Sequence, residues 1–185
     1  ASDMNWTGAL EELGQVLAAI DPQGIEEACA RIAAAPRVMG FAGGREGLML
    51  RALVMRLAHL GKAASYQGDM AAPPLGPGDL LLCSAGPGGI STVAALMGRA
   101  AEAGASVLYL TAEPDRAPAG LATQVLAIPA QTMASDRGAA ATSVLPMGSL
   151  YEGALFLLFE GMVLRLRDLL GETPESMRAR HTNME

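Results

Sequence analysis

Short apolar runs alternate along the chain with longer segments whose apolar residues recur every three or four positions. The short runs predict strands near 37–42, 63–66, 79–83, 106–111 and 124–128, and the longer segments predict helices near 46–60 and 90–103. This alternation is typical of parallel βαβ units. We therefore expect an α/β fold, a three-layer α/β/α sandwich around a five-stranded parallel sheet of flavodoxin-like order 2-1-3-4-5.

Two further helices are expected before the first strand. The first is predicted by apolar residues at helical spacing: Trp6, Leu10, Leu13, Leu17 and Ile20. Asp21 and Pro22 supply an N-cap and a first-turn proline for the second helix, which runs through Ala35.

A long apolar helix is expected after the last strand. The segment 129–146 lacks periodicity and is predicted to be a mobile loop, and the helix near 148–170 then leads into a polar tail. With 185 residues the chain is sized for one domain. We expect a single domain over 1–185, with N-terminal helices at 5–35, an α/β core at 37–128 and a C-terminal helix and tail at 147–185.

The apolar surface of the terminal helices predicts self-association. Few polar residues interrupt the apolar surface of the long helix, and the first helix adds an apolar stripe of its own. One small sheet cannot easily cover both. We therefore expect a homo-oligomer, a dimer of dimers, with an isologous interface formed by these helices.

The net charge and the cysteine content limit the kinds of partner and the cellular compartment that we expect. The formal net charge of -6 argues against nucleic-acid binding, which needs a basic face. The most apolar helix is interrupted by Glu160 and is too short to span a bilayer. Cys29 and Cys83 have no CxxC spacing and no disulfide framework, which predicts reduced thiols and a cytoplasmic location.

Two glycine-rich turns each connect a predicted strand to a helix. They are Ala42–Gly47 and Ser84–Gly89, at the carboxyl ends of the first and third strands, where a sheet of this order has its ligand crevice. Glycine permits close approach of the backbone, and each following helix offers free N–H groups. The turns predict a pocket for a phosphorylated small molecule, with these candidate ligands: Gly44, Arg45, Glu46, Ser84, Gly86, Gly88 and Gly89.

Several motifs resemble the sugar isomerase (SIS) domain family and, within it, the 6-phospho-3-hexuloisomerases. They are Gly44–Gly47, Met55–Gly61, Gly78–Leu81, Pro146–Glu152 and the tail Met177–Glu185. The resemblance covers most of the chain. It implies interconversion of a 3-ketohexose 6-phosphate with fructose 6-phosphate through a cis-enediol, a tetramer, and no metal or organic cofactor.

The resemblance also implies catalytic residues. Glu152 matches the family's proton-shuttling glutamate, and His181 in the tail could act as acid or base, reaching a neighbouring subunit's site. Without the resemblance, a first-turn glutamate complements the helix dipole and a tail histidine is solvated. His59, in the last turn before Gly61, is expected to cap carbonyls.

The glycine turns depart from the family's pattern. The usual Ser-Gly-Ser-Gly-Glu-Thr is here Ser84–Gly89 with only the first hydroxyl kept, and the usual Arg-Ser-Gly has become Arg45-Glu46-Gly47. A carboxylate at position 46 repels a phosphate unless it points away or pairs with Arg45. Ser91 or Thr92 could supply the missing hydroxyls.

Two alternatives stay open. One is a catalytically degenerate module that binds a sugar phosphate or serves assembly. The other is dinucleotide binding, because 42–47 is one residue from G-x-G-x-x-G and Asp69 follows at a suitable distance for a ribose contact.

Overall fold

The computed structural model describes residues 4–184 and contains a five-stranded parallel sheet in the order β2-β1-β3-β4-β5. The strands are β1 Arg37–Ala42, β2 Ala63–Tyr66, β3 Leu80–Ser84, β4 Ser106–Thr111 and β5 Gln124–Ala127. The predicted fold class and strand order are confirmed. Residues 1–3 and 185 of the predicted single domain lie outside the described residues.

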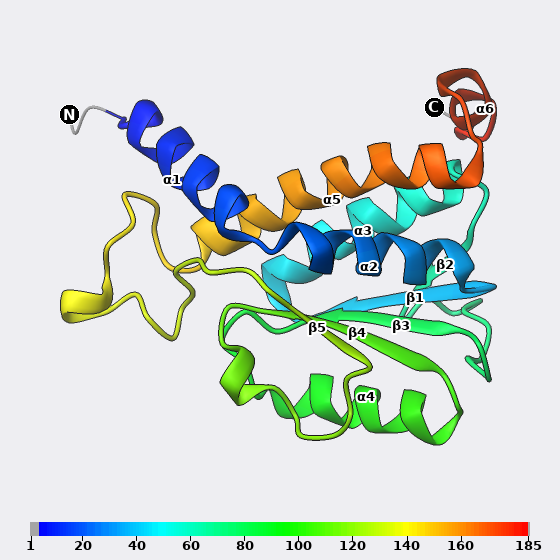
Figure 1. Ribbon diagram of the computed structural model, residues 1–185, viewed down its shortest axis with the longest axis horizontal. Helices are drawn as coiled ribbons and strands as arrows, with labels where there is room; N and C mark the ends of the chain where they lie inside the picture. Colours follow the sequence, from blue (N-terminus) through cyan, green and yellow to red (C-terminus); the bar gives the residue numbers. More distant parts are fainter. Residues whose placement is uncertain (1–3, 185) are drawn as a thin grey trace.

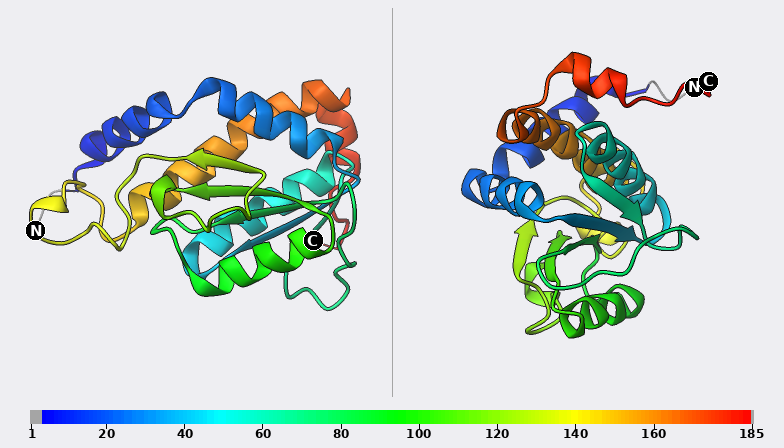
Figure 2. Two further views of the ribbon diagram at one scale, coloured as in Figure 1. Left: turned by 60° about the horizontal axis from the view of Figure 1, so that its bottom comes forward. Right: turned by 90° about the vertical axis from the view of Figure 1, so that its right-hand side faces the viewer.

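The helices form two unequal layers around the sheet (Figures 1 and 2). On one face lie α1 Trp6–Ala19, α2 Pro22–Ala34, α3 Gly44–His59 and α5 Ser149–Leu170, whereas α4 Ser91–Glu102 covers the other. The short helix α6 Pro174–Ala179 packs on α3, and single 3₁₀ turns occur at Pro114–Arg116 and Gly138–Ala140. The tail thus contains a helix that its polar composition did not predict.

The start of β3 differs from the expected strand because of Asp79. Its buried carboxylate accepts hydrogen bonds from the backbone N–H groups of Gly76, at 2.9 Å, and Arg37, at 3.1 Å. These bonds make Asp79 part of the turn before the sheet, so the strand begins one residue later, at Leu80. The same bonds tie this turn to the start of the neighbouring strand β1.

The segment between β5 and α5 is a long loop, as predicted, and side chains hold it together. The Gln131 amide donates to the Met147 carbonyl and accepts from the N–H groups of Thr142 and Ser143. Glu12 on α1 accepts from the backbone N–H of Val144 at 2.8 Å. These bonds fix where α5 begins. The predicted mobility of the loop stays a prediction.

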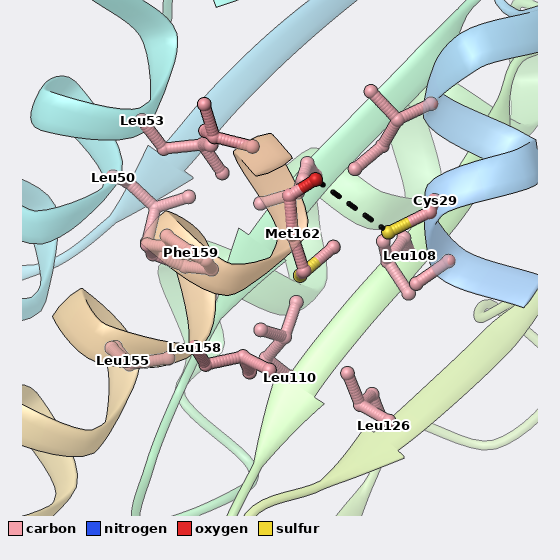
Figure 3. Packing of buried hydrophobic residues seen from close by; sticks show 14 of the residues in the cluster. Cys29, Leu50, Leu53, Leu108, Leu110, Leu126, Leu155, Leu158, Phe159 and Met162 are labelled. Atoms are coloured by element: carbon pink, nitrogen blue, oxygen red, sulfur yellow. Dashed lines mark hydrogen bonds between the residues drawn. The ribbon is translucent and has the colours of Figure 1, made fainter. Parts of the chain in front are cut away.

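The main core lies between the sheet and the helices α2, α3 and α5 (Figure 3). Leu50 and Leu155 are fully buried there, and Phe159 is 2% exposed. Cys29 contributes its thiol, which donates to the Met162 carbonyl (Figure 3). A second buried cluster lies between the sheet and α4.

Both cysteines are free, as the absence of CxxC spacing and of a disulfide framework predicted, and both are buried. Burial raises the pKa of the Cys29 thiol to about 11 and that of Cys83 to about 12. Thiols with such pKa values are mostly protonated at neutral pH and therefore poorly reactive.

Large apolar side chains remain exposed on the helical layer. On α1, Trp6 is 67% and Leu10 is 69% exposed, and on α5, Leu164 is 57% exposed. The buried side of α1 meets α5 closely, since a Cβ at Gly153 would lie 3.1 Å from the Leu13 side chain. Among residues 4–184, no helix is long and apolar enough to cross a membrane.

Candidate active site

The two glycine turns lie next to each other at the carboxyl ends of β1 and β3. These strands are neighbours in the sheet, and Ala42 at the end of one is paired with Ser84 at the end of the other. A cavity of about 330 Å³ opens here between the turns, the start of α5 and the loop before it. Its lining is Gly43, Gly44, Arg45, Glu46, Pro87, Ile90, Thr132, Met133, Gly148, Tyr151 and Glu152.

Glu152 projects from the first turn of α5 into this cavity. Its carboxylate accepts a hydrogen bond from the Arg45 Nε, with 2.6 Å between the two atoms. The Glu152 side chain is 14% exposed, whereas that of Arg45 is 71% exposed. The predicted base therefore lies within the cavity, and the charged hydrogen bond from α3 orients it.

The Glu46 carboxylate makes hydrogen bonds that the sequence did not predict. The carboxylate neither points away from the turns nor pairs with Arg45. It accepts from the Ser84 hydroxyl at 2.6 Å and from the Gly86 N–H at 3.0 and 3.1 Å. We call these two donors, Ser84 Oγ and Gly86 N, the cradle. The cradle holds the chain's own carboxylate.

The pKa of Glu46 lies above that of an ordinary glutamate. Burial raises the pKa of Glu46, and the negative charge of Glu152 raises it further, while the hydrogen bonds from Ser84 and Gly86 oppose both effects. Two carboxylates thus share one pocket, and only Glu152 has an arginine partner.

Tyr151 is a site residue that sequence reasoning missed. Its hydroxyl lies 2.9 Å from Ser84 Oγ, so it completes the hydrogen-bond network around Glu46. Burial raises the pKa of Tyr151 well above its usual value, and the charge of Glu46 adds to the effect. The available signal was its position beside Glu152 in the first turn of a mostly apolar helix.

The second glycine turn is crowded rather than open. A Cβ at Gly86 would lie 3.0 Å from the Tyr151 ring and from Glu46 Oε1, so a serine there would force one of them to move. Gly88 has φ +71°, and a Cβ there would lie 2.7 Å from the Arg116 side chain. Gly88 and Gly89 therefore pack against the Pro114–Arg116 turn and are not part of the cavity lining.

The hydroxyls expected to replace the missing ones lie elsewhere. Ser91 and Thr92 are exposed in the first turn of α4, and neither lines the cavity. Of the predicted ligands, the structure brings together Gly44, Arg45, Glu46, Ser84 and Gly86, with the predicted base Glu152 beside them. It leaves out Gly88, Gly89 and Ser91.

His181 is far from this cavity within one chain. Its ring stacks on that of His59, with 5.2 Å between centroids and 26° between planes, next to a separate cavity of about 360 Å³. Arg180 holds the tail there by donating to Glu172 and to the His59 carbonyl. The His59 ring was expected to cap backbone carbonyls. Instead, Arg180 caps the carbonyl of His59, and the His59 ring contacts Arg56.

The remaining candidate, Asp69, is engaged at the end of β2. Its carboxylate accepts from the Tyr66 N–H at 2.9 Å and pairs with Arg51 at 3.3 Å. Within residues 4–184, no group of three or more acidic, histidine or cysteine side chains is placed to hold a metal ion.

The arrangement suits proton transfer on a small polar ligand. An oriented carboxylate lies inside a pocket whose lining combines glycine backbone, apolar side chains and one exposed arginine. Removal of a C–H proton next to a carbonyl needs such a positioned carboxylate. An enzyme of this kind also needs donors for the ligand's oxygens, which the exposed guanidinium of Arg45 can provide.

Comparison with known proteins yields close relatives. The chain is 35% identical over 175 residues to the 3-hexulose-6-phosphate isomerase of Mycobacterium gastri, covering 95% of this chain and 87% of that protein. It is 29% identical to the enzyme of the same name from Bacillus subtilis (strain 168), covering 95% of each chain. No model of a known protein family matches.

Solved structures share the fold. A hypothetical protein from Methanococcus jannaschii, for which a molecular function of 3-hexulose-6-phosphate isomerase was inferred, superposes with a TM-score of 0.80. The two are 19% identical, and the match covers 97% of this chain and 98% of the other.

Proposed function

This chain belongs to the 3-hexulose-6-phosphate isomerase family of sugar isomerase (SIS) domain proteins, and from that premise we propose that it is a phosphosugar isomerase acting on a ketohexose phosphate. The reaction would interconvert 3-hexulose 6-phosphate and fructose 6-phosphate. The observation that carries the proposal is the Glu152 carboxylate, oriented by Arg45 inside the cavity at the glycine turns.

The mechanism needs one base and a route for a hydroxyl proton. Glu152 removes the proton from C2 of the 3-keto sugar, which gives a cis-enediol across C2 and C3, and returns it to C3. The hydrogen on O2 moves to O3 in the same process, so that the carbonyl passes from C3 to C2. No atom is gained or lost.

His181 is the proposed acid and base for the sugar oxygens, and it would act in another protomer's site. Within one chain the separation is large: Glu152 is in the first turn of α5, and His181 follows α6 beyond its far end. A helix of 22 residues is about 33 Å long. His181 is exposed and lies beside a cavity at the surface, where a second copy could meet it.

Deuterium exchange tests the proposed reaction and identifies the carbons involved. Fructose 6-phosphate incubated with the protein in D₂O is expected to lose its C3–H signal in the proton NMR spectrum, because the proton held by Glu152 exchanges with solvent. Loss at C1 instead would indicate aldose–ketose isomerisation. Binding without exchange at either carbon would contradict the proposal and favour a degenerate sugar-phosphate-binding module.

We further propose that the protein is a dimer of dimers. Support comes from the apolar side chains that α1 and α5 leave exposed, Trp6, Leu10 and Leu164 among them. Light scattering at micromolar concentration is expected to give about four times the chain mass of 19.0 kDa. Leu10→Lys should lower that mass, whereas Met70→Lys, at an exposed position after β2, should leave it unchanged. A wild-type mass equal to that of one chain would rule out the assembly and the shared site.

The compartment proposed for the enzyme is the cytoplasm. Its support is the pair of buried free thiols, Cys29 and Cys83, which are not joined to each other.

A further inference from the structure

Glu46 fills the position that the glycine turns would otherwise offer to an anion. One carboxylate takes the Ser84 hydroxyl and the Gly86 N–H, which are the two donors of the cradle. Pro87, the next residue of the turn, has no N–H to offer. An incoming anion would therefore meet a cradle whose hydrogen bonds are already in use.

Electrostatic repulsion also disfavours an anion in the cradle. When Glu46 is ionised, a phosphate dianion that bonded the same donors would lie within a few ångströms of its carboxylate, at a half-buried position where solvent screens the repulsion only in part. The charged groups that face the pocket are Glu46, Glu152 and Arg45. The arginine is turned toward Glu152 and is bonded to it, so it does not neutralise Glu46.

A carboxylate in this position suits a different kind of ligand group. It accepts hydrogen bonds and carries no donor when ionised, so a sugar hydroxyl is a good partner and a phosphate oxygen is not. Among residues 4–184, the Oε1 atom of Glu46 bonds only the Gly86 N–H, at 3.0 Å, and Glu46 is one of the residues that line the cavity. A substrate hydroxyl can reach the carboxylate from there.

We propose that Glu46 is a specificity-determining residue, which keeps phosphate out of the cradle and binds the uncharged hydroxyl end of a ketose in its place. The proposal rests on the proposed function in one respect, that this pocket binds the ketose that is isomerised. The phosphate of a phosphorylated substrate would then lie outside the cradle and would contribute little to affinity.

Two variants at position 46 separate the effect of the negative charge from the effect of the space that the side chain occupies. Glu46→Gln keeps the size of the side chain and an acceptor for the Gly86 N–H but removes the charge. Glu46→Ser removes the charge and also opens the cradle. Glu102→Gln is the matched control, because it removes one negative charge at an exposed position on α4, where Glu102 pairs with Arg99.

The experiment is calorimetric titration of each protein with fructose 6-phosphate, fructose and inorganic phosphate. For the wild type, the dissociation constants of fructose and its 6-phosphate are expected to differ by less than about tenfold. Glu46→Ser should tighten binding of the phosphate ester by about tenfold or more, the effect of one hydrogen bond to a charged group, and leave fructose binding no tighter. Glu46→Gln should give a smaller gain, and Glu102→Gln none.

The opposite results would overturn the proposal. They are a wild-type preference for the phosphate ester of about 100-fold or more, or no tightening in either variant at position 46. Thermal unfolding of each variant checks that it folds, and Glu46→Gln, which keeps the packing, decides the question if Glu46→Ser does not. Because these are binding measurements, they stand apart from the deuterium exchange that tests the isomerase itself.

Discussion

Glu152→Gln is expected to lower the rate of C3 deuterium exchange and of isomerisation by about 100- to 10,000-fold, the usual contribution of a positioned acid or base. The amide is the same size, and its oxygen can still accept the hydrogen bond from Arg45 that the structure shows at 2.6 Å. Ligand affinity should therefore change much less than the rate. Turnover close to that of the wild type would remove Glu152 from the mechanism.

The control for this variant lies on the same helix. Asp168→Asn makes the same chemical change in the last turn of α5, where the side chain is 64% exposed and pairs with the neighbouring Arg167. It is expected to leave kcat and the exchange rate unchanged. Comparison of the two variants separates loss of the base from a general effect of neutralising a carboxylate on α5.

Leu155→Ala is expected to lower the free energy of unfolding by about 2–5 kcal/mol. Leu155 is fully buried in the main core between α5 and the sheet (Figure 3), and the smaller side chain leaves a cavity that surrounding residues only partly fill. A loss of this size is a large part of the roughly 5–15 kcal/mol that stabilises an ordinary domain. Urea unfolding followed by circular dichroism measures it.

Leu169→Ala is the matched comparison. Leu169 lies near the end of the same helix and is 41% exposed, so its truncation should cost about 1 kcal/mol or less. Equal losses in the two variants would mean that the core is not packed as described. Both variants replace leucine with alanine, a slightly better helix former, so the small gain in helix propensity cancels in the comparison.

The sequence predicted those features of the fold that depend on local patterns. Alternation of apolar runs and helical segments was enough for the strands, and the glycine turns followed from residues that are adjacent in sequence. Asp21 as N-cap of α2 is a further case, since its carboxylate accepts from the N–H groups of Gln23 and Gly24. Such contacts span two or three residues and are visible in a single chain.

The details of the site depend on contacts between distant residues. Glu46 meets Ser84 and Gly86 across 38 and 40 residues, and nothing near position 46 indicates which way its side chain points. The tail presents the same difficulty, because Arg180 reaches the His59 carbonyl across 121 residues. Charge repulsion between Glu46 and a phosphate could be foreseen, whereas occupation of the cradle by Glu46 itself could not.

Tyr151 and Glu152 are consecutive residues in the first turn of α5, and they are attached to different parts of the molecule. The Tyr151 hydroxyl is within hydrogen-bond distance of the Ser84 hydroxyl at the end of β3. The Glu152 carboxylate accepts a hydrogen bond from Arg45 in the first turn of α3. Because one turn of helix moves as a unit, any displacement of this end of α5 shifts both the proposed base and the group that supports Glu46. If both proposals hold, rate and substrate preference are mechanically coupled, so a change selected for one property will retune the other.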